Sequence, residues 1–143
     1  MIDNPKLYRD FMHVSHFLRH GHGDPTLKVA PGQHRVLTVL IDVEGEAGLP
    51  QRDLGAQMGL SPAALSELLA KLEDRGLVKR ERSREDRRVT LVSLTAKGRK
   101  QAQSLVDAEA RVADDTFGAL DDADREKLAS ILAKMISNWE GAE

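Results

Sequence analysis

Apolar positions in this chain recur mostly every three or four residues, which is the period of an α-helix. This period predicts a helix over Pro5 to His20 and a second from about Pro31 to Asp42. Two further helices are expected in the last third of the chain, one capped by Thr95 and one beginning after Asp121-Asp122. The chain is therefore predicted to be mainly α-helical.

Between these helices, the residues at helix ends predict two short helices joined by a tight turn. Pro50 is expected at the first position of the earlier helix, and Gly59 is expected to close it in the left-handed conformation. Ser61 can cap the later helix through its hydroxyl, and Gly76 ends that helix. A short helix, a glycine turn and a capped second helix form the layout of a helix-turn-helix.

The pattern becomes extended after this motif. Leu77 to Arg82 and Val89 to Leu94 are the extended stretches, and the second is rich in β-branched residues. A charged loop from Ser83 to Arg88 separates them. We expect a small two-stranded β-hairpin with a basic tip, which forms the wing of a winged helix-turn-helix.

The first and last helices each carry an apolar stripe that one small domain cannot easily bury. A partner subunit could cover both stripes, so we expect a homodimer. The residues expected at its interface are Leu7, Phe11, Val14, Leu18, Leu128, Ile131, Leu132, Met135, Ile136 and Trp139. The predicted architecture is one domain over 1–143, with a winged helix-turn-helix lobe over 31–98 and dimerisation helices over 1–22 and 99–143.

Charge is distributed unevenly, although the formal net charge is only −2. Residues 75–100 include ten basic and three acidic residues, whereas residues 107–143 include ten acidic and four basic residues. A basic block on a nearly neutral chain points to a surface that binds a polyanion. An ordinary solvated surface is the alternative interpretation of the charge alone.

Composition argues against several classes of protein. The absence of cysteine removes disulfides, thiolate catalysis and thiolate zinc sites. The polar start is not that of a signal peptide and no stretch is long enough to span a bilayer, so we expect a cytoplasmic protein without membrane contact. No phosphate loop, nucleophile elbow or convincing pair of carboxylates is found, so we expect neither an enzyme nor a cofactor.

Three histidines, His13, His16 and His20, share one side of the first helix. With His22 and His34 they could form a metal site, and the chain would then be a metal-responsive regulator. Roles at an interface or at a helix end are the preferred alternative, because a histidine near a helix C-terminus is favoured by the helix dipole. We therefore assign no metal ligand.

Four motifs, in their order and spacing, resemble the MarR family (multiple antibiotic resistance regulators). They are LGAQMGLS at 54–61, LEDRGLV at 72–78, DRR at 86–88 and VSLTAKG at 92–98. The resemblance covers nearly the whole chain. It implies a triangular dimer in which the terminal helices interlock and two winged helix-turn-helix lobes bind a palindromic operator in double-stranded DNA.

The resemblance also implies how each lobe contacts DNA. The second helix of the motif would enter the major groove, and Arg88 on the wing would reach the minor groove while Asp86 orients the wing. The residues expected to contact DNA are Gln51, Arg52, Ser61, Ala63, Ala64, Ser66, Glu67, Lys71, Arg75, Arg82, Arg84, Arg87 and Arg88.

The chain departs from the family at the start of this second helix. Many members carry Arg or Thr where this chain has Pro62, Ala64 and Glu67. Because arginine is the commonest specific reader of guanine, base reading is expected to rest on Ser66, Glu67 and the alanines Ala63 and Ala64, with DNA shape contributing.

The predicted function is sequence-specific regulation of transcription, as a repressor released by a small aromatic or phenolic effector. The resemblance implies that the effector binds between the lobes, with Phe17, His34, Arg35 and Val106 as candidates for its walls. Two alternatives are a metal-responsive regulator on the same scaffold and a winged-helix module that binds protein. The basic wing argues against the second of these.

Overall fold

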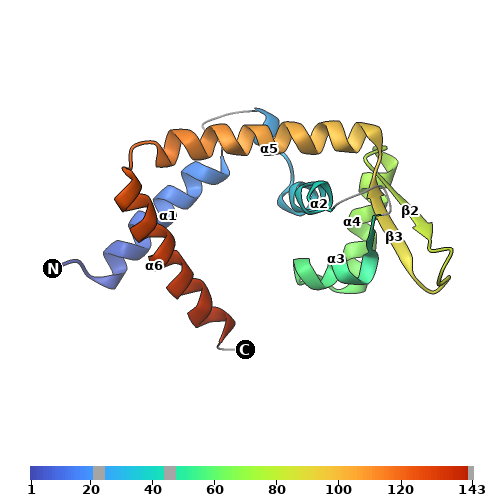
Figure 1. Cartoon of the computed structure of the whole chain (residues 1–143), viewed down its shortest axis with the longest axis horizontal. Coiled ribbons are helices and arrows are strands. Elements are labelled where there is room, and N and C mark those ends of the chain that lie inside the picture. The colour runs from blue at the N-terminus through green and yellow to red at the C-terminus, as the bar shows by residue number, and fades with distance from the viewer. Residues whose placement is uncertain (21–24, 44–47, 142–143) are drawn as a thin grey trace. The chain divides into compact units, whose positions relative to one another are not determined.

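The architecture is mainly α-helical with one small sheet, as predicted from the sequence (Figure 1). The computed structural model describes residues 1–20, 25–43 and 48–141. The elements in chain order are α1 (Asn4–Arg19), the 3-10 helix η2 (Pro25–Leu27), α2 (Pro31–Ile41), β1 (Leu49–Pro50), α3 (Gln51–Met58), α4 (Pro62–Asp74), β2 (Val78–Arg82), β3 (Thr90–Leu94), α5 (Ala96–Phe117) and α6 (Asp122–Glu140).

The chain divides into two compact units. Residues 23–109 form the larger unit, which contains α2, α3, α4, the sheet and the first part of α5. Residues 1–22 and 110–143 form the other, which contains α1, the end of α5 and α6. The division falls inside α5. The dimerisation helices over 1–22 and 99–143 stay a prediction.

Four of the predicted helix ends in the middle of the chain, at Gly59, Ser61, Gly76 and Thr95, are confirmed. Ser61 Oγ accepts a hydrogen bond from the backbone N–H three residues later at 3.2 Å, and Thr95 Oγ1 accepts one from Gly98 at 2.9 Å. Gly59 and Gly76 follow α3 and α4 with φ of +64° and +72°. Glycine adopts this left-handed conformation without steric cost, which lets the chain turn sharply after each helix.

The sheet has three strands in the order β1-β3-β2, all antiparallel, and not the two that we expected. The added strand is β1, in which Leu49 pairs with Val92 and Pro50 with Leu91. Pro50 was expected inside the helix, but it has extended backbone angles and α3 begins one residue later. An edge strand tolerates proline because its missing N–H is not needed there.

A core of aliphatic side chains joins the helices and the sheet of the larger unit. The buried residues of this core are Val36, Leu37, Leu40, Leu54, Leu65, Leu69, Leu72, Leu77, Val78, Val92, Leu94, Ala102 and Leu105. Full burial of one leucine stabilises a fold by about 1.5–3 kcal/mol. The core thus fixes α3, α4 and the sheet against one another.

The other unit keeps much of its apolar surface exposed. Neither α1 nor α6 has a buried residue, and large apolar side chains on both helices are about half exposed. The most exposed of the residues expected at a dimer interface are Leu7, Phe11, Val14, Ile131, Ile136 and Trp139. Among the described residues, no helix is long and apolar enough to cross a membrane.

Candidate nucleic-acid interface

Helix α4 has one buried face and one exposed face. Leu65, Leu69 and Leu72 pack into the core of the larger unit. The side of the helix away from this core exposes Ser61, Ala63, Ala64, Glu67 and Lys71, all of which were expected to contact DNA. An exposed helical face of this kind has the dimensions that the major groove of DNA admits.

Ser66 was also expected to read bases, but its hydroxyl oxygen already has a partner within the chain. Arg80 on β2 donates from Nη1 to Ser66 Oγ at 3.2 Å, and from Nε to Glu73 Oε1 at 2.7 Å. The sequence analysis counted Arg80 only within the basic block and missed this cluster. The signal that could have found it is the seven-residue spacing of Ser66 and Glu73, which places both on one face of a helix.

Other polar residues of α4 also have partners. Glu67 and Lys71 lie one helical turn apart with 3.8 Å between Oε1 and Nζ, a surface pair that contributes little to stability. Arg75 follows the helix and donates from Nη1 to Gln33 on α2. The carbonyl of Arg75 accepts from Lys97 Nζ at 2.9 Å. The end of α4 is thereby tied to α2 and α5.

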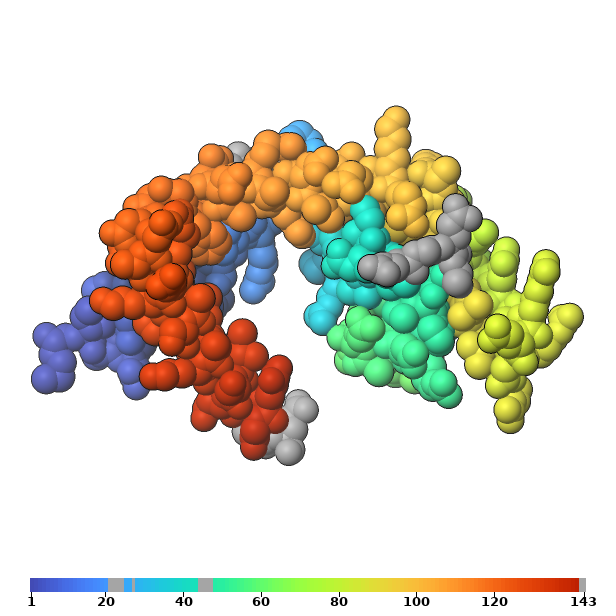
Figure 2. Space-filling view, viewed as in Figure 1, coloured from blue at the N-terminus to red at the C-terminus, as the bar shows by residue number. Residues whose placement is uncertain are grey.

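The wing comprises β2, β3 and the loop between them, residues 78–94, drawn in yellow-green in Figure 2. Ser83 closes the loop, because its N–H donates to the carbonyl of Val89 at 2.8 Å. Ser83 Oγ accepts from the backbone N–H groups of Glu85 and Asp86, each at 3.3 Å. Arg82 Nη1 donates to the carbonyl of Arg87 at 2.8 Å. The wing tip is a hydrogen-bonded turn.

Asp86 holds Arg88 at this tip. Asp86 Oδ1 accepts from the backbone N–H and from Nε of Arg88, and Oδ2 accepts from Nη2 at 3.2 Å. The side-chain and backbone hydrogen bonds from Arg88, together with the positive charge of Arg52, lower the pKa of Asp86. Arg88 is nevertheless 91% exposed, so it can contact another molecule while Asp86 restrains it.

Two further arginines at the tip, Arg84 and Arg87, are exposed. Within the part of the chain that the structure describes, neither guanidinium forms an ion pair. Their charge is therefore not neutralised locally. This is the property expected of side chains that contact phosphates.

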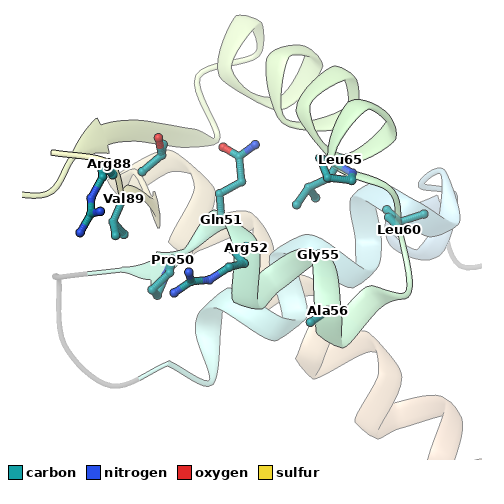
Figure 3. Close-up of a pocket in the computed structure, with 11 residues that line it drawn as sticks. Pro50, Gln51, Arg52, Gly55, Ala56, Leu60, Leu65, Arg88 and Val89 are labelled. Atoms are coloured by element: carbon teal, nitrogen blue, oxygen red, sulfur yellow. The ribbon is translucent and has the colours of Figure 1, made fainter. Parts of the chain in front are cut away.

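A pocket of about 330 Å³ lies between the wing and the start of α3 (Figure 3). Arg88 from the wing, Gln51 and Arg52 from α3, and Leu60 and Leu65 around the turn line it. The fold thus brings Arg88 to the same pocket as Gln51 and Arg52, which precede it by 37 and 36 positions, and all three were expected to contact DNA.

The four residues suggested for an effector site fall in both units. Phe17 belongs to the smaller unit, and His34, Arg35 and Val106 belong to the larger one. His34 Nε2 is hydrogen-bonded to Glu109 Oε1 on α5. Arg35 Nη2 donates to the carbonyl of Gln57 at 3.0 Å. These contacts connect α2 with α5 and α3 within the larger unit.

The histidines of α1 do not form a metal site among the described residues. His16 and His20 have their ring centroids 4.2 Å apart, but no group of three or more potential ligands could hold a metal ion there. His22 lies outside the described residues.

Comparisons with known proteins agree with this architecture. Residues 27–89 match the MarR family. The chain is 30% identical over 105 residues to the transcriptional regulator HosA of Escherichia coli, covering 73% of this chain and 76% of HosA. It is 33% identical over 95 residues to the uncharacterised HTH-type transcriptional regulator YdgJ of Bacillus subtilis, covering 66% of this chain but only 58% of YdgJ.

A solved structure with the same fold is that of MepR from S. aureus in a complex with DNA. The TM-score is 0.77 at 21% sequence identity, and the match covers 96% of this chain and 99% of MepR. This likeness shows that the chain has the winged helix-turn-helix fold of such proteins.

Proposed function

Because the chain belongs to the MarR family of transcriptional regulators, we propose that it represses transcription by binding a palindromic operator as a homodimer. Each subunit places α4 in the major groove and the wing tip against the neighbouring phosphates and minor groove. This assignment to regulators agrees with the sequence analysis, which expected no enzyme.

One observation carries the proposal: the exposed Arg88, restrained by Asp86, lies on the same pocket as Gln51 and Arg52 of α3 (Figure 3). An arginine that is held in place and fully hydrated loses little conformational freedom when it meets DNA. The core fixes the wing and α4 in one unit, so both can contact DNA without rearrangement.

Affinity and specificity are divided between these elements. Arg84 and Arg87 supply phosphate contacts, which raise affinity for any DNA and release counterions. Glu67 and the two alanines Ala63 and Ala64 face outward on α4, where they can contact cytosine N4 and thymine methyl groups. The wing adds contacts that depend on the width of the minor groove.

Dimerisation is supported by the exposed apolar stripes of α1 and α6. Side chains such as Phe11 and Trp139 are about half exposed in a single copy of the chain. A second copy of these two helices can bury both stripes, which removes the cost of their exposure to water. A two-fold symmetric dimer then reads two half-sites related by the same symmetry, which is why the operator is palindromic.

An effector is part of the proposal. A small aromatic acid would be bound by Arg35 through charge-assisted hydrogen bonds, and binding would reduce affinity for DNA. Phenolic acids should raise the melting temperature of the protein and release it from its operator, and Arg35→Ala should lose both effects. If no compound of a broad phenolic panel changes either quantity, this part of the proposal is wrong.

The experiment that tests the main proposal is selection of bound sites from a pool of random-sequence duplexes. We expect enrichment of a palindrome whose half-sites lie about one helical turn apart. Recovery of no sequence above background, together with affinity that does not depend on salt, would contradict the proposal. That result would favour the alternative of a winged-helix module that binds protein.

A further inference from the structure

Arg80 differs from the other arginines of the wing because it points back to α4. Its Nε donates to Glu73 Oε1 at 2.7 Å, and its Nη2 forms an ion pair with the same oxygen at 2.6 Å. Its Nη1 donates to Ser66 Oγ at 3.2 Å. The side chain of Arg80 is only 22% exposed, whereas that of Arg88 is 91% exposed. Arg80 is therefore neutralised and partly buried within the chain, and it is not free to contact phosphates.

The two contacts of Arg80 lie two turns apart on α4. Ser66 and Glu73 are separated by seven residues, which corresponds to about 10 Å along the axis of a helix. A planar guanidinium that bonds at two such points resists both sliding and rotation of α4 on β2. The leucines of the core hold another face of the helix, but apolar contacts have no preferred direction.

The contact with Arg80 also changes what Ser66 can do. A serine hydroxyl has one hydrogen to donate and two lone pairs with which to accept. One lone pair is taken by a cationic donor, which strengthens the hydroxyl as a donor. Ser66 is therefore suited to base edges that accept hydrogen bonds, such as guanine O6 and N7 or thymine O4, rather than to the amino group of cytosine.

We propose that Arg80 is a positioning residue for DNA recognition, which fixes α4 on the wing through Glu73 and Ser66 and turns the Ser66 hydroxyl into a hydrogen-bond donor. This inference rests on the proposed function. Arg80 adds specificity and not affinity, because its charge is already compensated by Glu73.

The test uses the full-length protein, a duplex that the wild type selects from a random pool, and a shuffled duplex of the same composition. Arg80→Lys keeps the charge but cannot span both partners, since an ammonium group is a single point donor. Ser66→Ala removes one partner and leaves the ion pair with Glu73. Both variants should lower the ratio of affinities for the selected and shuffled duplexes by about tenfold, with shuffled affinity and salt dependence unchanged.

Three controls separate positioning from general damage to the fold. Ser66→Thr keeps a hydroxyl and should retain the wild-type ratio. Lys79→Met removes a charge from the same strand whose ion-pair partner is Glu81, and it too should retain the ratio. Melting temperatures identify any variant that is unfolded. If Arg80→Lys is unfolded, the affinity ratio of Ser66→Ala alone decides the result.

The outcomes distinguish this inference from the function on which it rests. If the wild type selects a site but Arg80→Lys and Ser66→Ala keep its full specificity ratio, the role of Arg80 is overturned and DNA binding stands. A parallel loss of affinity for both duplexes would likewise overturn it, because Arg80 and Ser66 would then support DNA binding in general and not the reading of its sequence. If the wild type selects no site, the proposed function itself has failed.

Discussion

The carboxylate of Asp86 accepts three hydrogen bonds from Arg88. Its Oδ1 accepts from the backbone N–H at 3.0 Å and from Nε at 3.1 Å, and its Oδ2 accepts from Nη2 at 3.2 Å. This contact selects one arrangement of a long, flexible side chain before any partner is met. Immobilising such a side chain at an interface otherwise costs about 0.5–1.5 kcal/mol of binding free energy, because rotamer freedom is lost.

Removing the hydrogen bonds between Asp86 and Arg88 should weaken DNA binding. Asp86→Asn leaves Arg88 charged but less restrained, so we expect affinity for the selected operator to fall by about two- to tenfold. Titration by fluorescence anisotropy measures this change. Glu85→Gln removes an exposed acid from the same loop and serves as the matched control. Unchanged affinity in Asp86→Asn, beside a clear loss in Arg88→Ala, would show that Arg88 needs no orientation.

The same contact makes a prediction about pH. The hydrogen bonds from Arg88 lower the pKa of Asp86 in the folded protein. A group whose pKa is lowered on folding stabilises the fold above its unfolded pKa, and this contribution is lost as pH falls through the folded pKa. In Arg88→Ala the pKa of Asp86 should rise toward its usual value. Carbon NMR titration of the Asp86 carboxyl group measures the midpoint. Equal midpoints in the wild type and in Arg88→Ala would show that Arg88 does not lower the pKa of Asp86.

The junction between β2 and α5 should not tolerate a side chain at Gly98. A Cβ atom there would lie 1.8 Å from the carbonyl oxygen of Leu77, which cannot move without disturbing the sheet. We expect Gly98→Ala to lower the free energy of unfolding by about 3 kcal/mol or more, the upper end for an overpacked site.

Gly59→Ala is the control for this prediction, because nothing lies within 4 Å of the added Cβ and only the left-handed backbone is penalised. It should cost about 1–2 kcal/mol. Urea denaturation of both variants measures the difference. A Gly98→Ala protein as stable as Gly59→Ala would mean that Leu77 and Gly98 are not so close.

The exposed stripes of α1 and α6 predict the oligomeric state. Sedimentation should give twice the chain mass at micromolar concentration, and a double substitution of Phe11→Asp with Ile131→Asp should give monomers. Because the two half-sites are then no longer bound together, operator affinity should fall by about 100-fold. Arg9→Ala, on the side of α1 away from the apolar stripe, should remain a dimer. A wild-type monomer that binds its operator tightly would contradict this part of the account.

Local signals account for what could be predicted from the sequence. Ser61, Gly59 and Thr95 act on the backbone within a few residues, so the helix ends that they mark were placed correctly. The strand at Leu49 and Pro50 was missed because its partner, β3, lies about 40 residues further along and two residues give no periodic pattern.

The sequence analysis also failed to predict contacts between residues that are distant in the sequence. The sequence analysis placed Arg80 among exposed basic residues, since nothing local indicates that a strand arginine turns toward a helix. The same applies to the bond between His34 and Glu109, which are 75 positions apart. Such pairs depend on how elements pack, and periodicity within one element does not contain that information.

The central claim is that the arginines of the wing tip bind DNA phosphates, and the salt dependence of binding tests it most directly. The logarithm of the binding constant should fall linearly with the logarithm of salt concentration, by about 0.9 for each phosphate contact. Arg84→Ala removes one contact from each subunit of a dimer, so its slope should be shallower by about 2 on operator and shuffled DNA alike. Arg9→Ala, with the same change in charge, should keep the wild-type slope. If Arg84→Ala and Arg87→Ala both retain the wild-type slope, the wing does not contact phosphates and the account is wrong.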